Sequence, residues 1–267
     1  MISKNEINEN ARKFGVPVST IERDYAQNWL LKSFSSMNMA LKGGTGIRKA
    51  YISNYRFSDD LDFTLLEEQS KDKMEMLIKS CVKRAKEESG INFNEDISIK
   101  ENINGLEVGT FFRIMRTEGN TTKIKLDMTK FNNEKILLPL NAKNIIHLYS
   151  DNLEAKVMVY ALEEIVTEKI RSLFQRTRPR DLYDVGYLWS KCEPDKEKVL
   201  KILDEKFKFK GEKIDMGNIE KFERRKENFK NAWKNSLQHQ IKELPDFDDV
   251  FEYVKGEMIK FLIALNS

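Results

Sequence analysis

Along this chain the spacing of apolar residues changes from helical to alternating and then back to helical. Helical spacing, three or four positions apart, occurs at residues 3–36 and 71–89, and Gly90 follows the second segment as a helix stop. Strict alternation of apolar and polar residues then predicts strands. The alternating segments are 97–99, 108–115 and 122–129. The first part of the chain is therefore expected to combine helices with a sheet.

From about residue 155 onward only helical spacing remains. It predicts helices at 157–174 and 181–189 and several more before the C-terminus, with no strand. These patterns favour an α/β fold in two parts. We expect a mixed-sheet domain at residues 1–150 and an all-helical domain at 151–267.

The segment from Leu41 to Leu66 combines a glycine-rich turn with a pair of aspartates. Gly43-Gly44-Thr45-Gly46 can offer backbone N–H groups to phosphate. Alternation in the strand expected after this turn puts Ser58, Asp60 and Asp62 on one face and the apolar residues between them on the other. Two carboxylates on one face can share a divalent cation. The segment therefore predicts a site for a metal-bound nucleoside triphosphate.

An acidic pair is a weak motif when it stands alone. With 43 acidic residues in 267, roughly seven pairs with this spacing are expected by chance. The pair gains weight from Asp127, a third carboxylate on the polar side of the strand expected at 122–129. The combination of a glycine turn, two aspartates on one strand and a third on another is more specific than any of its parts.

Lys169 is out of place on its predicted helix. On a helical wheel of residues 157–174 it falls inside the apolar stripe, whereas Glu164 and Arg171 fall on the opposite, polar side. A lysine on an inner face needs an anionic partner or a water-filled cleft, because burying an unpaired charge is costly. A local salt bridge, or a side chain that reaches the edge of the stripe, would also satisfy it. The wheel leaves both interpretations open.

A basic loop follows, with Arg176, Arg178 and Arg180 within five residues. Arg180 and Asp181 stand where this loop enters the helix at 181–189, and Asp184 lies one turn further on. Asp181 alone could be a helix cap. Three arginines so close together suit phosphate or a nucleic-acid backbone.

Composition excludes several other classes of protein. Cys81 and Cys192 are too far apart for a zinc-type spacing or a disulfide framework. The two histidines, His147 and His239, stand near no nucleophile motif, which argues against a hydrolytic triad and a histidine-rich metal site. No apolar run reaches the length of a membrane span, and the first residues lack the core of a signal peptide. We therefore expect a cytoplasmic protein without a membrane partner.

Taken in order, these motifs resemble the AbiEii-type nucleotidyltransferases. These proteins are the toxin components of abortive-infection and type IV toxin–antitoxin systems, within the DNA polymerase beta-like nucleotidyltransferase superfamily. The resemblance covers most of residues 1–190. It rests on IERDY at 21–25, GGT at 43–45 with RFSDDLDF at 56–63, EKIRSL at 168–173 and RDLYD at 180–184.

The resemblance implies a minimal, polymerase beta-like nucleotidyltransferase domain with a mixed sheet, followed by a helical domain. It also implies roles for individual residues. The implied catalytic residues are Asp60, Asp62, Asp127, Lys169 and Asp181, and the implied nucleotide-binding residues are Gly43, Gly44, Thr45, Ser58, Lys169, Arg180 and Asp184. Asp60, Asp62 and Asp127 would bind Mg²⁺ or Mn²⁺, and Asp127 would also suit removal of the proton from an acceptor hydroxyl.

For function, the resemblance implies transfer of a nucleoside monophosphate from a nucleoside triphosphate to an acceptor. A tRNA acceptor and a toxin role restrained by a cognate antitoxin are implied as well. Two alternatives remain. The acceptor could be a small molecule or a protein, although the basic loop favours RNA. The chain could instead be a non-catalytic nucleotide- or RNA-binding module, although binding alone would not need both Asp60 and Asp62.

Overall fold

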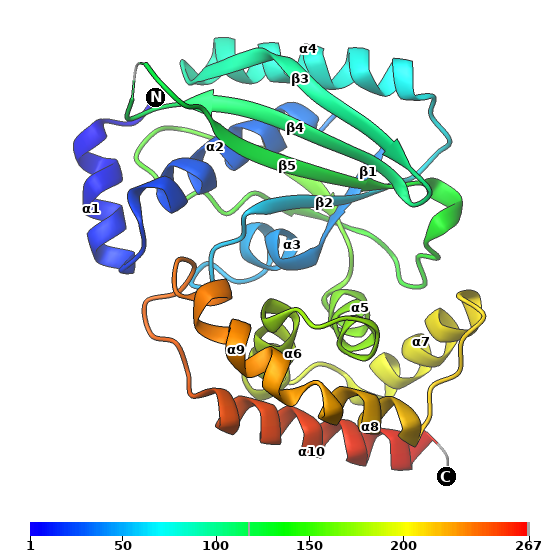
Figure 1. Ribbon diagram of the computed structural model, residues 1–267. Coiled ribbons are helices and arrows are strands. Elements are labelled where there is room, and N and C mark those ends of the chain that lie inside the picture. Colours follow the sequence, from blue (N-terminus) through cyan, green and yellow to red (C-terminus); the bar gives the residue numbers. More distant parts are fainter. Residues whose placement is uncertain (117, 266–267) are drawn as a thin grey trace. The chain divides into compact units, whose positions relative to one another are not determined.

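The computed structural model describes residues 1–116 and 118–265, and the chain divides into two compact units (Figure 1). One unit comprises Met1–Glu134 and Pro139–Tyr160, and it contains the sheet. The other comprises Lys135–Leu138 and Ala161–Ser267, and all its described regular elements are helices. The expected fold class, a mixed sheet followed by a helical region, is confirmed.

The sheet has seven strands in the described residues, in the order β3-β4-β5-β2-β1-β7-β6. The strands are β1 (Met39–Lys42), β2 (Asp60–Leu65), β3 (Asn92–Asn102), β4 (Gly105–Arg113), β5 (Thr122–Thr129), β6 (Asn141–Asn144) and β7 (Lys156–Val159). The β2–β5 and β1–β7 pairs are parallel, and the other neighbours are antiparallel. This order places β2, with its two aspartates, beside β5, which carries the third.

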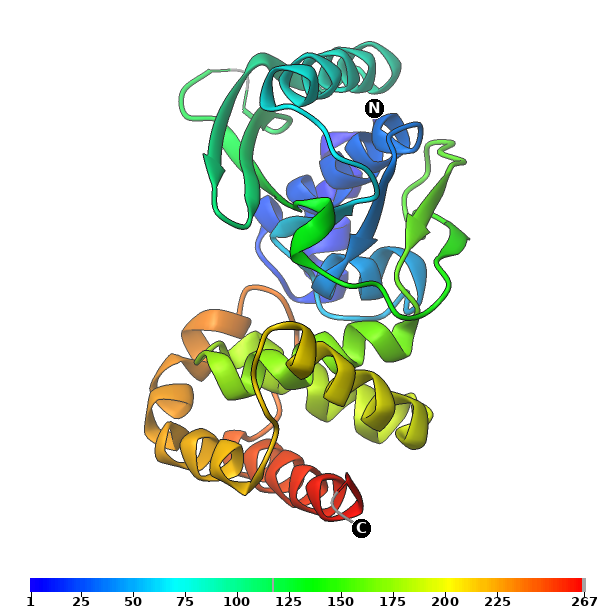
Figure 2. The same cartoon turned by 90° about the vertical axis from the view of Figure 1, so that its right-hand side faces the viewer.

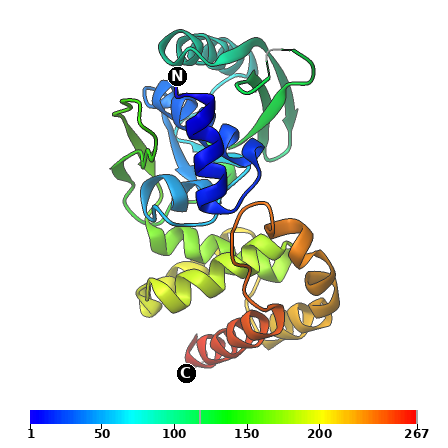
Figure 3. The same ribbon diagram turned by 90° about the vertical axis from the view of Figure 1, so that its left-hand side faces the viewer.

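In the part of the sheet unit that the structure describes, four α-helices and a short 3-10 helix accompany the strands. They are α1 (Lys4–Phe14), α2 (Val18–Phe34), α3 (Gly43–Ala50), α4 (Lys71–Ser89) and η1 (Phe131–Asn133). Helix α4 lies along β3 (Figure 2), and α1 packs against α2 (Figure 3). As expected, α4 ends at Gly90, whose left-handed φ of 72° suits a residue without a Cβ.

Alternation along the central strands separates an apolar face from a polar one. Leu61 and Phe63 of β2 are buried, and their register partners Leu126 and Met128 of β5 are buried on the same side. The ring of Phe34 in α2 packs at 6.1 Å from the ring of Phe63. Helix α2 therefore covers the apolar face, and Asp60 and Asp62 lie on the opposite one, as the alternation predicted.

The expectation of no strand beyond residue 155 is wrong. Strand β7 occupies Lys156–Val159, and the helix α5 begins only at Leu162. Val159 pairs with Leu41 of β1, and Val157 and Val159 are buried while Lys156 and Met158 are exposed. A strand of four residues gives too short a pattern to be separated from the start of a helix, so pairing with distant residues decides the structure.

The helical unit is built around α5 and α6. Its helices are α5 (Leu162–Gln175), α6 (Pro179–Lys191), α7 (Lys196–Phe209), α8 (Met216–Arg224), α9 (Lys226–Leu237) and α10 (Phe247–Leu265). Helix α5 packs against α6, α7 and α8, and α6 also packs against α9 and α10. No helix in the described ranges is both long and apolar enough to span a membrane.

A buried ion pair joins the short segment 135–138 to these helices. Glu164 and Lys206 are both 0% exposed, and their charged atoms lie 2.9 Å apart. Glu164 also accepts the backbone N–H groups of residues 137 and 138, and Lys206 donates to the carbonyl of Lys135. The polar face predicted for α5 at Glu164 and Arg171 is therefore wrong, because both residues are buried where α5 is packed on more than one side.

Candidate active site

The glycine-rich segment forms the first turn of α3 rather than a separate loop. Strand β1 ends at Lys42, and Gly43 turns the chain into the helix with a φ of 67°. A Cβ at Gly43 would lie 2.3 Å from the Oδ2 atom of Asp62, and one at Gly44 would lie 3.3 Å from the Oγ atom of Ser58. A Cβ at Gly43 would therefore overlap with the Asp62 carboxylate, and one at Gly44 would be in tight contact with Ser58, so the start of α3 lies close against both residues.

This first turn has the chemistry of an anion site. The first N–H groups of a helix have no acceptor within the helix, and they lie at the positive end of its dipole. The Thr45 hydroxyl donates to the backbone carbonyl of Asp60, which ties the turn to the start of β2. Gly43, Gly44, Thr45 and Ser58 are thus brought together with Asp62. Ser58 itself precedes β2 and is not part of the strand.

The three predicted carboxylates share one face of the sheet. Asp62 is the register partner of Asp127 on β5 and of Lys42 on β1, and Asp60 is the register partner of Lys125. Directly opposed residues on neighbouring strands point to the same side. Asp60, Asp62 and Asp127 therefore lie side by side on the face opposite Phe63.

Asp127 is engaged by a lysine on the same strand. The Nζ atom of Lys125 lies 3.1 Å from Asp127 Oδ2 and 3.0 Å from Glu107 Oε2. Partial burial opposes the charge of this lysine, but the hydrogen bonds to Glu107 and Asp127 outweigh it and raise the pKa of Lys125. Across the described ranges, no three histidine, cysteine, aspartate or glutamate side chains are grouped to hold a metal ion.

Asp60 and Asp62 fit a divalent cation of the kind that arrives with a nucleotide. Mg²⁺ in such sites is held by one or two protein carboxylates together with substrate phosphates, so a third protein ligand is not required. The two aspartates lie on one strand face, and the turn suited to phosphate lies against Asp62. The donor set therefore fits Mg²⁺ or Mn²⁺ without Asp127, whose role as a ligand stays a prediction.

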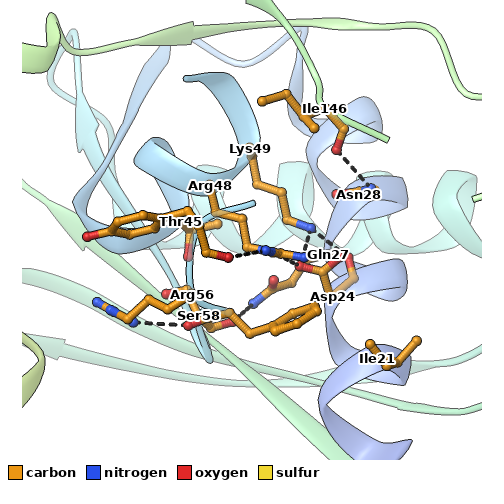
Figure 4. A network of polar contacts seen from close by, with 12 residues as sticks. Ile21, Asp24, Gln27, Asn28, Thr45, Arg48, Lys49, Arg56, Ser58 and Ile146 are labelled. Carbon is orange, nitrogen blue, oxygen red and sulfur yellow. Dashed lines mark hydrogen bonds and ion pairs between the residues drawn. The ribbon is translucent and has the colours of Figure 1, made fainter. Parts of the chain in front are cut away.

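A buried polar network lies behind this turn (Figure 4). Asp24 of α2 accepts from two consecutive cations of α3, with 2.6 Å to Arg48 Nε and 2.7 Å to Lys49 Nζ. Burial alone would raise the pKa of Asp24, but Arg48 and Lys49 hold it well below its usual range. Burial lowers the pKa of Lys49 to about 8, against the opposing effect of Asp24. Helix α2 thus fixes α3 through a cluster of charges that excludes water.

The same helices hold the segment that leads into β2. Arg48 donates to the Tyr55 carbonyl, and its guanidinium lies 3.6 Å from the centre of the Phe57 ring. Gln27 of α2 donates to the carbonyls of Ser58 and Asp59, each at 3.0 Å. The glycine-rich turn and the segment that leads into β2 are therefore both anchored to α2.

Sequence reasoning missed this anchoring set. Its members outside the predicted site are Asp24, Gln27, Arg48 and Lys49. The available signal was slight, because Asp24 and Arg48-Lys49 occur in segments that also carry other polar residues. A helical wheel marks such residues as unusual but does not pair them.

A second group of predicted residues lies in the helical unit. Lys169 of α5 is paired with two aspartates of α6, at 2.8 Å to Asp181 Oδ1 and 2.9 Å to Asp184 Oδ2. Arg176 Nε lies 3.0 Å from the other oxygen of Asp181. These are the anionic partners that the inward position of Lys169 required. The side chain of Arg180 is half-buried in the first turn of α6.

Asp181 does not cap its helix. The cap of α6 is Arg178, and Asp181 lies within the first turn. Burial would raise the pKa of Asp181, but the nearby charges of Lys169 and Arg176 outweigh this and lower it. The predicted residues thus fall into two groups, one in each unit, and the structure brings the members of each group together.

Comparison with known proteins shows that one family model covers the residues of both groups. The family model described as the nucleotidyl transferase AbiEii toxin of type IV toxin–antitoxin systems matches residues 26–253. Among solved structures, the nucleotidyltransferase toxin MenT4 from Mycobacterium tuberculosis H37Rv is 17% identical, with a TM-score of 0.67 over 98% of this chain and 90% of that one. JHP933 from Helicobacter pylori is 16% identical, with a TM-score of 0.59 over 94% and 95% of the two chains. No curated protein sequence matches.

Proposed function

Because the chain belongs to the AbiEii family of nucleotidyltransferase toxins of type IV toxin–antitoxin systems, we propose that it transfers a nucleoside monophosphate from a nucleoside triphosphate to RNA. We further propose that the acceptor is tRNA and that Mg²⁺ or Mn²⁺ is required. The reaction would arrest growth in the cytoplasm as an abortive-infection response until a cognate antitoxin restrains it. The observation that supports the proposal is the close approach of Gly43 to Asp62, in which a turn suited to phosphate lies against a carboxylate suited to a metal ion.

The first turn of α3 binds the triphosphate in this proposal. Backbone N–H groups from Gly43 to Thr45 contact phosphate oxygens, and Ser58 Oγ, which lies against Gly44, adds a hydroxyl donor. Asp60 and Asp62 hold the cation, which when bound offsets the charge of the phosphates and polarises the α-phosphorus. Both aspartates lie on a strand whose start is anchored to α2, so little ordering of the protein is needed when the nucleotide binds.

Asp127 acts on the acceptor in this proposal. The acceptor hydroxyl gives its proton to the Asp127 carboxylate while its oxygen forms a bond to the α-phosphorus. The bond from that phosphorus to the β-phosphate oxygen breaks, and pyrophosphate leaves. Asp127 is 41% exposed, and as the register partner of Asp62 it lies next to the cation ligands.

The helical unit carries a second group of cations. Lys169, held in a fixed position by Asp181 and Asp184, and Arg180 both suit a phosphate oxygen of a nucleotide. Arg176 and Arg178 are exposed in the loop before α6 and suit the phosphate backbone of an RNA acceptor. That basic loop is the feature that favours RNA over a small molecule or a protein.

A labelling experiment tests the reaction and its acceptor together. Purified protein is incubated with Mg²⁺, each α-labelled nucleoside triphosphate in turn, and total tRNA. We expect label on tRNA with at least one nucleotide, and no label with an Asp62→Asn variant. Label on protein or on a small molecule would contradict the RNA acceptor, and nucleotide binding without any transfer would leave a binding module.

A further inference from the structure

A positive charge stands inside the carboxylate face of the sheet. Lys125 is the register partner of Asp60, in the row next to the Asp62–Asp127 pair. Its ammonium group lies between Asp127 and Glu107, which are themselves register partners across β4 and β5. The lysine is therefore placed among the predicted cation ligands rather than at the margin of the sheet.

We propose that Lys125 is a positioning residue that holds Asp127 and weakens the affinity of the carboxylate face for a divalent cation in the absence of nucleotide. This inference rests on the proposed function, because it concerns the same cation. Lys125 supplies a built-in counter-charge to Asp127. A metal ion that arrives with a triphosphate brings further oxygen ligands and does not need Asp127, whereas a free ion would.

The geometry supports this role in two ways. First, the Lys125 ammonium is within hydrogen-bonding distance of the Asp127 and Glu107 carboxylates, at 3.1 and 3.0 Å, so Asp127 is held by its lysine. Second, the side chains of Lys125, Glu107 and Asp127 are 33%, 38% and 41% exposed, so an incoming ion can reach them.

Charge balance gives the direction of the effect. Asp60, Asp62, Asp127 and Glu107 place four carboxylates on this face, and Lys125 lies among them. Removing one positive charge a few ångströms from the cation position strengthens cation binding, and for a partly exposed site the expected gain is about tenfold. The gain should shrink as salt is added, because the interaction is screened.

The test measures Mn²⁺ binding without nucleotide, by electron paramagnetic resonance of the free ion. We expect Lys125→Met to bind Mn²⁺ about tenfold more tightly than the wild type, and Lys125→Arg to bind it as the wild type does. Adding Asp127→Asn to Lys125→Met should remove the gain. Lys86→Met is the matched control, because Lys86 forms an exposed salt bridge with Glu95 at 2.8 Å between α4 and β3.

Several results would overturn the inference. They are an unchanged or weaker Mn²⁺ affinity in Lys125→Met, no Mn²⁺ binding by either protein, or a loss of nucleotide affinity alone, which would make Lys125 a phosphate contact. Thermal melting of each variant shows that it is folded. The RNA-labelling result distinguishes failure of this inference from failure of the proposed function. If wild-type protein labels RNA and Lys125→Met leaves Mn²⁺ binding unchanged, only this inference fails, whereas absence of labelling with every acceptor contradicts the proposed function itself.

Discussion

Asp62 of β2 and Asp127 of β5 are register partners in a parallel pair of strands, although helix α4 and two further strands separate them in the sequence. The pairing sets two carboxylates at the same level of one sheet face. It turns two chance-level features of the sequence into neighbours that can act on one substrate.

Replacing Asp62 by asparagine should abolish transfer without unfolding the protein. The side chain is only partly buried and lies on the polar face, so its charge contributes to cation binding more than to packing. We expect a loss of at least about a thousandfold in the rate of RNA labelling, together with loss of growth inhibition. Glu101→Gln, at an exposed position of β3, is the control and should keep wild-type activity. A parallel drop in melting temperature would instead indicate a structural role for Asp62.

Gly43→Ala should damage nucleotide binding more than stability. The new Cβ would both strain a left-handed backbone and overlap with the Asp62 carboxylate. Gly211→Ala is the matched control, because Gly211 has a φ of 71° but no atom within 4 Å of its Cβ position. Both variants should lose about 1–2 kcal/mol of unfolding free energy in chemical denaturation. Only Gly43→Ala should also lose affinity for a nucleoside triphosphate, and equal losses in both variants would contradict the close-approach role.

Asp24→Asn should strongly destabilise the sheet unit. It leaves Arg48 and Lys49 buried without their carboxylate, and breaking a buried ion pair from one side costs about 3–5 kcal/mol. Chemical denaturation at pH 7 measures this loss. Because the folded-state pKa of Asp24 lies below its ordinary value, its contribution is present above the unfolded pKa near 4 and declines as the pH falls below it. A variant with wild-type stability would show that the network is not a support for α3.

Lys49 should give a pH dependence of the same sign as Asp24, but at alkaline pH. Its folded-state pKa of about 8 lies below the ordinary lysine value of 10.5, so between these values the unfolded chain binds more protons than the folded one. Stability contributed by this group therefore rises as the pH rises from 8 to 10.5. The difference in unfolding free energy between wild type and Lys49→Met should shift in favour of the wild type across that window. A difference that stays constant or falls would contradict the lowered pKa.

Lys169 can be separated into a structural and a functional role by a pair of variants. Lys169→Met leaves Asp181 and Asp184 buried without their main cation, which should cost about 3–5 kcal/mol. Adding Asp184→Asn removes one of those charges and should restore part of the unfolding free energy. If Lys169 contacts phosphate, the double variant stays inactive in the RNA-labelling assay. Recovery of activity along with stability would show that the lysine serves only to balance the aspartates.

Sequence patterns predicted those parts of the fold in which local signals and packing agree. Alternation identified β5 and the polar face of β2, because β5 and the first four residues of β2 are buried on one side only. Helix α4 was predicted because an amphipathic pattern ends at a glycine that must adopt a left-handed conformation. The residues of the predicted site are brought together within each unit for the same reason.

The parts that were missed depend on partners distant in the sequence. Strand β7 forms because Val159 pairs with Leu41, and a pattern of four residues is too short to predict that pairing. Glu164 was assigned to a solvent-facing surface because a helical wheel assumes one buried side, whereas α5 is packed against three helices and pairs Glu164 with Lys206. The Asp24 network could not be predicted either, because burial of each of its charges is tolerated only when the others are buried beside it.

Residues 135–138 belong to the helical unit although the residues on either side of them belong to the sheet unit, and this affects the expression of parts of the protein. The chain leaves the sheet unit after Glu134, contributes a short segment to the helical unit, and returns to form β6 and β7. Neither unit is therefore encoded by one continuous stretch. If the gene were divided after residue 160, the sheet fragment would carry the segment 135–138 without its partners Glu164 and Lys206. In the helical fragment, this buried pair would lack the hydrogen bonds that the segment provides.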